Sequence, residues 1–278
     1  MGTLYLVATP IGNLEDMSPR AVRTLREVRL IAAEDTRHTR QLLTHFVIHT
    51  QMTSYFEYNK LAKLDVVLSA LSEGDVALVS DAGTPGINDP GYELIKAALK
   101  AGYPVSPVPG PSAPIAALAA SGLPTDAFLY LGYLPRKSSE RKEFLSGVAD
   151  QPYTLIFLEA PHRLLESLED LLAVLGDRPI TAARELTKLH EQFVRGRISE
   201  VREHFTQNEP RGEFVLVVDG MRELSTERWT DEQMRVAIAR ELKDGGKAKE
   251  ISTRLSIQSG WNKKEVYSYM NRSSENKK

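Results

Sequence analysis

The stretch that decides the fold is SDAGTPGINDPG, residues 80–91. It follows DVALV (75–79), an apolar run typical of a buried strand, and it precedes YELIKAALKAG (92–102), whose apolar spacing predicts an amphipathic helix. A connection between a strand and a helix needs only about 2 to 6 residues. This longer connection is rich in Gly, Pro, Asp and Asn, so we expect it to hold a ligand as well as joining two elements.

Strand and helix patterns alternate on both sides of this stretch. The apolar patterns predict strands over 4–9, 29–35, 53–56 and 75–80, and helices over 19–28, 60–73, 91–102 and 112–122. Such alternation is typical of an α/β domain with a largely parallel sheet, which we place at residues 1–120. The segment SGLPTD (121–126) has the composition of a linker.

Two further regions follow the linker. Strand patterns over 127–134, 153–160, 179–187 and 212–220 and helix patterns over 137–149 and 162–176 predict a second α/β domain at residues 121–222, while 190–205 mixes both characters. Three short helices, over 230–246, 247–260 and 262–272, then predict a small accessory domain of helix-turn-helix style at residues 226–275.

Composition narrows the class of protein. The chain of 278 residues is 42% hydrophobic and 26% charged, which is normal for a soluble globular protein. It contains no run near the roughly 20 apolar residues that span a bilayer and no secretory signal pattern. It has no cysteine, which excludes disulfides, thiolate zinc sites and cysteine nucleophiles and fits a reducing compartment. We therefore expect a cytoplasmic protein without membrane contact.

The charge is unevenly distributed along the chain. Residues 221–278 contain 13 Lys and Arg against 9 Asp and Glu, a net charge of +4, and this leaves −6 for residues 1–220 because the whole chain carries −2. A basic C-terminal region fits either a solvated surface or an anionic partner.

Three loops rich in Gly and Pro each follow a predicted strand: ATPIGN (8–13), SDAGTPGINDPG (80–91) and PVPGPSA (107–113). In an open parallel sheet, loops beyond the carboxyl ends of the strands face one crevice, where ligands bind. We therefore expect a small-molecule site there. A dinucleotide is not indicated, because ATPIGN has one glycine where G-x-G-x-x-G has three, and GxxxxGK[ST] is absent.

Eight motifs carry a resemblance to a known family. They are ATPIGNLEDMSPRA, AAEDTRHTRQLL, SDAGTPGINDPGYEL, PGPSAPIAALAASGLP, LGYLPRKSSERK, EAPHRL, RELTKLHEQFVRG and RGEFVLVVDG. In this order, over about residues 2–220, they closely resemble the ribosomal RNA small subunit methyltransferase I family of the tetrapyrrole methylase superfamily. Eight motifs in register are far more specific than one pattern.

The resemblance implies both a fold and an activity. It implies two α/β domains of tetrapyrrole-methylase type with S-adenosyl-L-methionine in the cleft between them. It also implies a homodimer that 2′-O-methylates a cytidine ribose in the decoding region of 16S rRNA, with the small ribosomal subunit as partner. The cofactor contacts it implies are Pro10, Asp81, Gly83, Thr84, Gly86, Ser112, Ala113, Leu158, Gly212, Glu213 and Phe214.

The residue types suit this cofactor. Backbone N–H groups of GPSA (110–113) at a helix start could bind its carboxylate. The carboxylate of Asp81 could accept hydrogen bonds from its ammonium or hydroxyl groups, although an Asp in a turn also satisfies its own backbone. Apolar Val79, Ile87 and Leu158 could enclose the adenine.

Methyl transfer to a ribose hydroxyl requires in-line alignment and a route for the hydroxyl proton. Candidate proton acceptors or orienting groups are Glu34, Asp35, Glu159, Glu185 and Lys188. We favour Asp35 or Glu185, with Arg37 and Lys188 as helpers, while a structural ion-pair network remains the alternative for each. No metal is expected, because THFVIHT (44–50) has the pattern of a strand or turn and offers only two histidines.

Basic clusters predict where RNA phosphates would bind. They include Arg136, Lys137, Arg141, Lys142, Arg195, Lys263 and Lys264. Trp261, Tyr267 and Tyr269 could stack on bases, but their helical spacing is also that of a core. Two other functions stay open: a methyltransferase acting on a tetrapyrrole-like small molecule, and a ligand-sensing regulator that binds DNA through its C-terminal helices.

Overall fold

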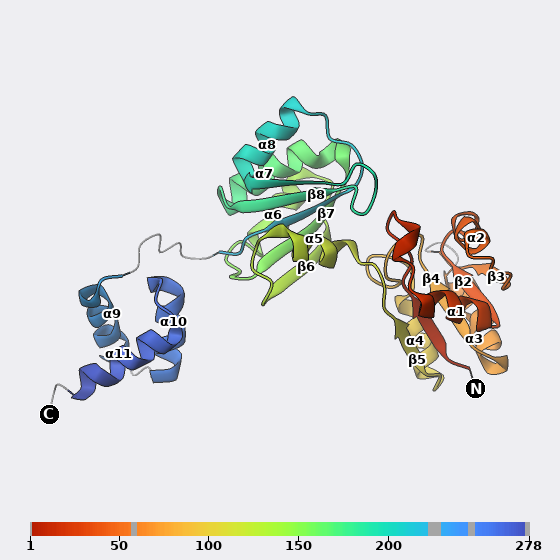
Figure 1. Ribbon diagram of the computed structural model, residues 1–278, viewed down its shortest axis with the longest axis horizontal. Coiled ribbons are helices and arrows are strands. Elements are labelled where there is room, and N and C mark those ends of the chain that lie inside the picture. Colours follow the sequence, from red (N-terminus) through yellow and green to blue (C-terminus); the bar gives the residue numbers. More distant parts are fainter. Residues whose placement is uncertain (1, 57–59, 222–228, 244–247, 276–278) are drawn as a thin grey trace. The chain divides into compact units, whose positions relative to one another are not determined.

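The computed structural model describes residues 2–56, 60–221, 229–243 and 248–275 (Figure 1). The chain forms two compact units. One comprises residues 1–148 and 153–218 and contains two β-sheets, and the other comprises residues 149–152 and 219–278. The boundary expected between residues 222 and 226 lies outside the described residues.

The first sheet is parallel throughout. Its strands are β1 (Leu4–Val7), β2 (Leu30–Ala33), β3 (Met52–Ser54), β4 (Val76–Val79) and β5 (Val105–Val108), in the order β3-β2-β4-β1-β5. All four pairs of neighbouring strands are parallel. The expected α/β domain with a largely parallel sheet is confirmed.

Helices cover both faces of this sheet. They are α1 (Pro19–Glu27), α2 (Thr36–His45), α3 (Lys60–Glu73) and α4 (Tyr92–Lys100), with the short 3-10 helix η1 (Leu14–Asp16) before α1. Leu25 of α1 and Leu43 of α2 share a buried cluster with Ile31. Leu71 of α3 and Leu94 of α4 share the other cluster with Leu78. The parallel strands are thus buried on both faces, which explains their continuous apolar sequences.

Helix α2 was not predicted, and the strand or turn expected at 44–50 is wrong at its start, because α2 continues to His45. Its sequence TRHTRQLLTH is rich in Thr and His, which are weak helix formers. The helix is stabilised by packing of Leu42 and Leu43 and by the side chain of Asp35, which accepts a hydrogen bond from the N–H of Arg37. The buried packing and the N-cap together override the weak propensity.

The second sheet is mixed. Helix α5 (Ala113–Ser121) leads to β6 (Phe128–Tyr133), α6 (Ser138–Ser146), β7 (Thr154–Glu159), the 3-10 helix η2 (Pro161–Arg163), α7 (Leu164–Leu175), β8 (Pro179–Arg184), β9 (Gln192–Arg197), α8 (Ile198–Gln207) and β10 (Phe214–Val218). The strand order is β6-β7-β10-β8-β9, with β6 and β7 parallel and the other pairs antiparallel. Helix α5 contacts β7, β8 and β10, while α6, α7 and α8 pack in sequence against one another.

The C-terminal unit contains α9 (Asp231–Lys243), α10 (Ala248–Ser259) and α11 (Lys263–Glu275). Its core is formed by Met234, Ile238, Ile251, Leu255, Trp261, Val266 and Met270. Trp261 donates its indole N–H to the carbonyl of Trp229 at 2.7 Å and contacts the ring of Tyr269 edge-on. Trp261 and Tyr269 are therefore core residues, whereas Tyr267 is exposed. None of the helices in the described ranges has the length and apolar character that a membrane span requires.

Candidate functional site

A cavity of about 260 Å³ lies at the carboxyl ends of the parallel strands. Small-molecule sites usually measure roughly 300–1,000 Å³, so this volume lies slightly below that range. It is lined by Ile11, Glu34, Asp81, Ala82, Gly83, Thr84, Ile87, Asn88, Asp89, Ser112, Ala113, Pro114, Tyr130, Tyr133, Leu158, Glu185, Leu186, Lys188, Glu213, Phe214 and Val215. We call it the main cavity.

The three Gly/Pro loops meet here and are joined by backbone contacts. The N–H groups of Thr9 and Gly83 each donate to the carbonyl of the other, at 2.9 and 3.0 Å. The hydroxyl of Thr84 donates to the carbonyl of Pro111 at 3.4 Å. Gly83 has a φ of 79°, which favours glycine, so this junction depends on a residue without a Cβ.

Most of the residues expected to contact a cofactor line the main cavity. These are Asp81, Gly83, Thr84, Ser112, Ala113, Leu158, Glu213 and Phe214. Pro10 lies instead on a neighbouring cavity with His38. Gly86 and Gly212 are outside the lining, and both have left-handed backbone conformations, with φ of 80° and 75°. Such angles favour glycine, and the cofactor contact expected at Gly86 and Gly212 stays a prediction.

The carboxylates of Glu34 and Asp81 each accept a hydrogen bond from a backbone N–H group near the other residue. The carboxylate of Glu34 accepts a hydrogen bond from the N–H of Asp81 at 3.2 Å, and the carboxylate of Asp81 accepts one from the N–H of Asp35 at 3.1 Å. Burial raises the pKa of Glu34, and the charges of Asp81 and Asp35 raise it further. Asp81 thus lines the cavity and fixes the backbone of Asp35, which is distant in sequence, rather than its own turn.

Asp89 is a cavity residue that sequence reasoning missed. Burial raises its pKa to about 6, with further contributions from the charges of Glu34, Asp81 and Glu213, although a hydrogen bond with Ser80 opposes the shift. Asp89 belongs to the quoted GINDPG stretch, so its place in that loop was the available signal. Tyr130 and Tyr133 of β6 were also missed because the β6 sequence indicates only a strand.

Glu185 and Lys188 line the main cavity from the loop between β8 and β9. The ammonium of Lys188 lies 2.9 Å from the Glu185 carboxylate, and this contact holds the pKa of Glu185 below its ordinary value. Glu185 and Thr187 have positive φ angles of 49° and 65°. Strained backbone of this kind persists where the surroundings fix it, and it is frequent at functional sites.

Asp35 and Arg37 do not line the main cavity. Asp35 caps α2 and forms an ion pair with Arg37, with 2.7 Å between the carboxylate and the guanidinium. The hydrogen bonds from Arg37 hold the pKa of Asp35 well below its usual range, which makes this carboxylate a weak base. The alternative of a structural ion pair therefore describes Asp35 and Arg37 better.

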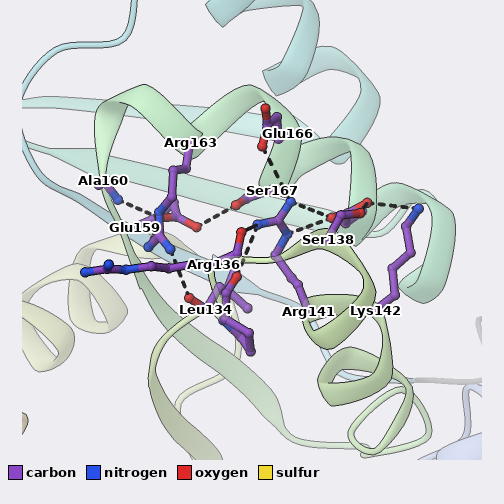
Figure 2. A network of polar contacts seen from close by, with 12 residues as sticks. Leu134, Arg136, Ser138, Arg141, Lys142, Glu159, Ala160, Arg163, Glu166 and Ser167 are labelled. Atoms are coloured by element: carbon purple, nitrogen blue, oxygen red, sulfur yellow. Dashed lines mark hydrogen bonds and ion pairs between the residues drawn. The ribbon is translucent and has the colours of Figure 1, made fainter.

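Glu159, the last residue of β7, is fully buried and does not line the main cavity; Figure 2 shows its partners. Its carboxylate accepts hydrogen bonds from the N–H of Ala160 at 2.7 Å and the hydroxyl of Ser167 at 2.5 Å. It also lies 2.5 Å from the guanidinium of Arg163. These partners occupy the carboxylate, so Glu159 is structural.

Arg141 requires a correction: it was expected to bind RNA, and that prediction is wrong. Its side chain is 0% exposed and forms an ion pair of 2.6 Å with Asp170, whose side chain is 5% exposed (Figure 2). The pattern LPRKSSERK does not show that Arg141 faces inward, because its partner Asp170 lies 29 residues away on α7.

The other basic residues expected to bind RNA differ in their surroundings. Arg136, Lys137, Lys263 and Lys264 are exposed, and the half-exposed Lys142 has its ammonium 3.2 Å from Asp170. The guanidinium of Arg195 already has partners within the protein. It donates to the carbonyls of Ala120 and Ser121 and lies 4.9 Å from the centre of the Phe193 ring.

The fold and this acidic cavity define a class of protein. A model of the family described as tetrapyrrole (corrin/porphyrin) methylases matches residues 3–202. Uroporphyrin-III C-methyltransferase from Thermus thermophilus has the same fold, with a TM-score of 0.54 at 21% identity over 78% of this chain and 94% of that one. Diphthine synthase superposes with a TM-score of 0.59 at 13% identity, over 79% and 90%.

Similar sequences narrow the class further. Ribosomal RNA small subunit methyltransferase I of Synechocystis sp. is 47% identical over 269 residues, which is 96% of each chain. The protein of that name from Bacillus subtilis is 43% identical over 96% of this chain and 93% of its own, and that from Escherichia coli O157:H7 is 50% identical over 79% and 78%. The chain therefore belongs to the ribosomal RNA small subunit methyltransferase I family.

The protein is thus a methyltransferase, and its methyl donor is S-adenosylmethionine. The main cavity fits this cofactor, which carries a positive sulfonium and an ammonium group. Glu34, Asp81, Asp89 and Glu213 bring carboxyl groups to the lining, and Ile11, Ile87 and Leu158 give it apolar surface. The start of α5 at Ser112 and Ala113 supplies N–H groups suited to a carboxylate.

Proposed function

We propose that this protein transfers the methyl group of S-adenosylmethionine to the 2′-hydroxyl of a cytidine in the decoding region of 16S rRNA, on the assembled small ribosomal subunit. The observation that carries the proposal is the set of relatives, 43–50% identical, that are named ribosomal RNA small subunit methyltransferase I. The cavity supports it, because its lining suits a cationic methyl donor.

The carboxyl groups of the main cavity have a defined task in this reaction. Negative charge from Glu34, Asp81 and Glu213 favours the cationic donor over its neutral product, because the sulfonium charge disappears on transfer. Removing the Asp81 carboxylate by Asp81→Ala is therefore expected to weaken S-adenosylmethionine binding, measured by isothermal titration. Unchanged affinity would remove Asp81 from the cofactor site.

Asp89 is the best-placed proton acceptor within this proposal. A general base works best when its pKa is near the operating pH, and Asp89 combines a pKa of about 6 with a position in the cavity lining. Glu185 and Lys188 then act as a charge-paired group that orients the substrate. In the pH profile of kcat/KM for S-adenosylmethionine, which reports the free enzyme, the acidic limb is expected near pH 6 and is expected to be absent in Asp89→Asn.

We propose that the RNA contacts Arg136 and Lys137, which follow the lining residue Tyr133, Lys142 on α6, Arg195, and Lys263 and Lys264 on α11. Helices α9 to α11 have a core of their own. Ending the chain at residue 225 is therefore expected to leave cofactor affinity intact and to raise the KM for the subunit. We further propose that the protein is cytoplasmic and acts as a homodimer. Sedimentation in solution tests the homodimer.

The deciding experiment uses radiolabelled S-adenosylmethionine and small ribosomal subunits that lack the modification. After nuclease digestion, label in a 2′-O-methylated cytidine is the expected result. Label in another nucleoside would contradict the assigned target. No label despite tight cofactor binding would contradict the RNA substrate and favour a tetrapyrrole-like small molecule or a ligand-sensing regulator.

A further inference from the structure

The backbone of the loop between β6 and α6, residues 134–137, accepts hydrogen bonds from two arginines, Arg141 and Arg163. We call it the β6–α6 loop. It directly follows Tyr133, which lines the main cavity and is 51% exposed, and it carries the exposed side chains of Arg136 and Lys137. Three successive backbone carbonyls of this loop, those of Leu134, Pro135 and Arg136, accept hydrogen bonds from guanidinium groups.

Arg163 of η2 holds the beginning of the loop. Its Nη1 donates to the carbonyl of Leu134 at 3.3 Å, while its Nη2 lies 2.5 Å from the carboxylate of Glu159 (Figure 2). Glu159 is itself fixed by Ser167 and by the N–H of Ala160. The position of Arg163, whose side chain is 14% exposed, is therefore determined by a fully buried carboxylate.

Arg141 of α6 holds the rest of the loop. Its Nη1 donates to the carbonyls of Pro135 and Arg136, both at 3.2 Å, and its Nε donates to Asp170 at 2.7 Å. Asp170 also accepts a hydrogen bond from Ser138 at 3.0 Å. The two arginines thus form parallel arrangements, in which a buried carboxylate orients a guanidinium and the guanidinium fixes backbone.

Stability alone does not require this arrangement. Taking a guanidinium and a carboxylate out of water is costly, and apolar residues of similar volume often stabilise a fold as well or better. What the ion pairs supply is geometry: a guanidinium donates in a rigid planar fork, so it can satisfy a carboxylate and backbone carbonyls together. With its carbonyls turned toward the arginines, the loop presents the side chains of Arg136 and Lys137 to solvent.

We infer that the β6–α6 loop is a preorganised edge for binding the RNA backbone, and that Arg141 and Arg163 are the positioning residues that set it. The inference rests on the proposed function. Arg136 and Lys137 offer a guanidinium and an ammonium group to phosphates, and the adjacent Tyr133 offers an aromatic ring to an unstacked base. A loop already held in its bound conformation loses less entropy when RNA binds.

Arg163→Lys tests the inference. Lysine keeps a positive charge opposite Glu159 but lacks the second nitrogen arm that reaches Leu134. The expected result is a KM for the small subunit raised about tenfold, with kcat and the Kd for S-adenosylmethionine changed less than about twofold. The matched control is Arg178→Lys, because Arg178 donates to the carbonyl of Leu175 at the far end of α7, away from the cavity. The control is expected to leave KM unchanged.

A double-mutant cycle separates positioning from general weakening of the fold. In a background of Arg136→Ala and Lys137→Ala, the outward charges are gone, so Arg163→Lys is expected to raise KM no further. The same factor in both backgrounds would overturn the inference, because it would show an effect that does not pass through the loop side chains. Circular dichroism confirms folding, and Arg141→Lys takes the place of Arg163→Lys if the latter does not fold.

The outcomes distinguish this inference from the proposed function. If the unaltered protein labels the small subunit and the cycle is multiplicative, the inference fails and the function stands. If the unaltered protein transfers no label to the subunit, the proposed function fails and the inference with it.

Discussion

The two sides of the main cavity are built in different ways. On the side of the parallel sheet, loops after β1, β4 and β5 approach one another as backbone, and Gly83 makes the junction possible. On the side of the mixed sheet, the β6–α6 loop, which follows the lining residue Tyr133, is held by side chains, through Arg141 and Arg163 and their buried carboxylates. The first side suits close backbone approach to a small cofactor. The second suits the outward presentation of charge to a large anion.

The two sides also differ in which residues determine the conformation of each loop. A glycine loop depends on the conformation of single residues, so one added methyl group can disturb it. A loop held by buried ion pairs depends on partners that are distant in sequence, and removing one partner leaves a buried charge without compensation. Substitutions on the two sides should therefore fail for different reasons.

The largest expected effect is on the ion-pair side. Asp170→Asn keeps the shape of the side chain but removes the buried counter-charge of the Arg141 guanidinium, which is 0% exposed, and leaves only the exposed Glu166 at 3.9 Å. Breaking a buried pair in this way costs about 3–5 kcal/mol of unfolding free energy, to be measured by urea denaturation. Glu169→Gln, at an exposed neighbouring position on α7, is the control and should be nearly neutral. A small loss in Asp170→Asn would show that the carboxylate of Glu166, 3.9 Å from the Arg141 guanidinium, suffices as a counter-charge.

The next effect is on the glycine side. A Cβ at Gly91, where φ is 151°, would lie 2.9 Å from Leu78 Cδ2 and 3.2 Å from the backbone N of Gly86. Gly91→Ala is expected to cost about 1–3 kcal/mol of unfolding free energy and to weaken S-adenosylmethionine binding. In Gly122→Ala, φ is also positive at 82° but no atom lies within 4 Å of the added Cβ, so only backbone strain is expected. Equal cofactor affinity in the two variants, by calorimetry, would contradict a shaping role for the 80–91 loop.

A smaller effect comes from Asp89 on the same side. Because burial and nearby carboxylates raise its pKa to about 6, the folded protein favours the protonated form, and this contribution to stability is lost as pH rises through about 6. Asp89→Asn is expected to stabilise the cofactor-free protein at pH 8 by about 1 kcal/mol, after allowing for solvent screening of a partly exposed carboxyl. The gain should disappear below about pH 4, where Asp89 is protonated in both states.

Thermal unfolding of Asp89→Asn and the unaltered protein at a series of pH values measures this effect. A gain that does not change with pH would assign the stabilisation to something other than the ionisation of Asp89. The same substitution should weaken cofactor binding at pH 8, because a negative charge is removed from the cavity.

The smallest effect is expected at an exposed ion pair of the β6–α6 region. Lys137 and Glu140 are 2.9 Å apart, but their side chains are 76% and 55% exposed. Exposed pairs contribute about 0–1 kcal/mol, so Glu140→Gln should leave the urea midpoint almost unchanged. A loss comparable with that of Asp170→Asn would contradict the distinction between buried and exposed pairs on which the comparison rests.

Much of the parallel sheet could be predicted from sequence, because its strands and helices have clear patterns of apolar residues and end at residues that commonly terminate such elements. The runs at β1, β2 and β4 are continuously apolar and are bounded by Gly, Pro and Asp. Helix α2 could not be predicted, because its residues are weak helix formers and Leu42 and Leu43 stabilise it only once they are packed. The mixed region at 190–205 likewise separates into β9 and α8 only through pairing with β8.

For the cavity, sequence located the loops better than the individual side chains. Asp81, Gly83 and Ser112 lie where the motifs indicated. Asp35 and Glu159 were considered as proton acceptors because the sequence of an acidic residue at the end of a strand does not show whether its side chain faces a cavity or an ion-pair partner. Asp35 pairs with Arg37, and Glu159 pairs with Arg163.

The sequence by itself determined the family, the α/β class and the three Gly/Pro loops that form one side of the cavity. These are local properties, since periodicity, turn chemistry and motif order can be read without knowing what touches what. The tertiary structure alone decided which charges face inward. Arg141 and Arg136 belong to the same basic cluster, yet one is buried against Asp170 and the other is exposed, because burial depends on partners that folding brings from elsewhere in the chain.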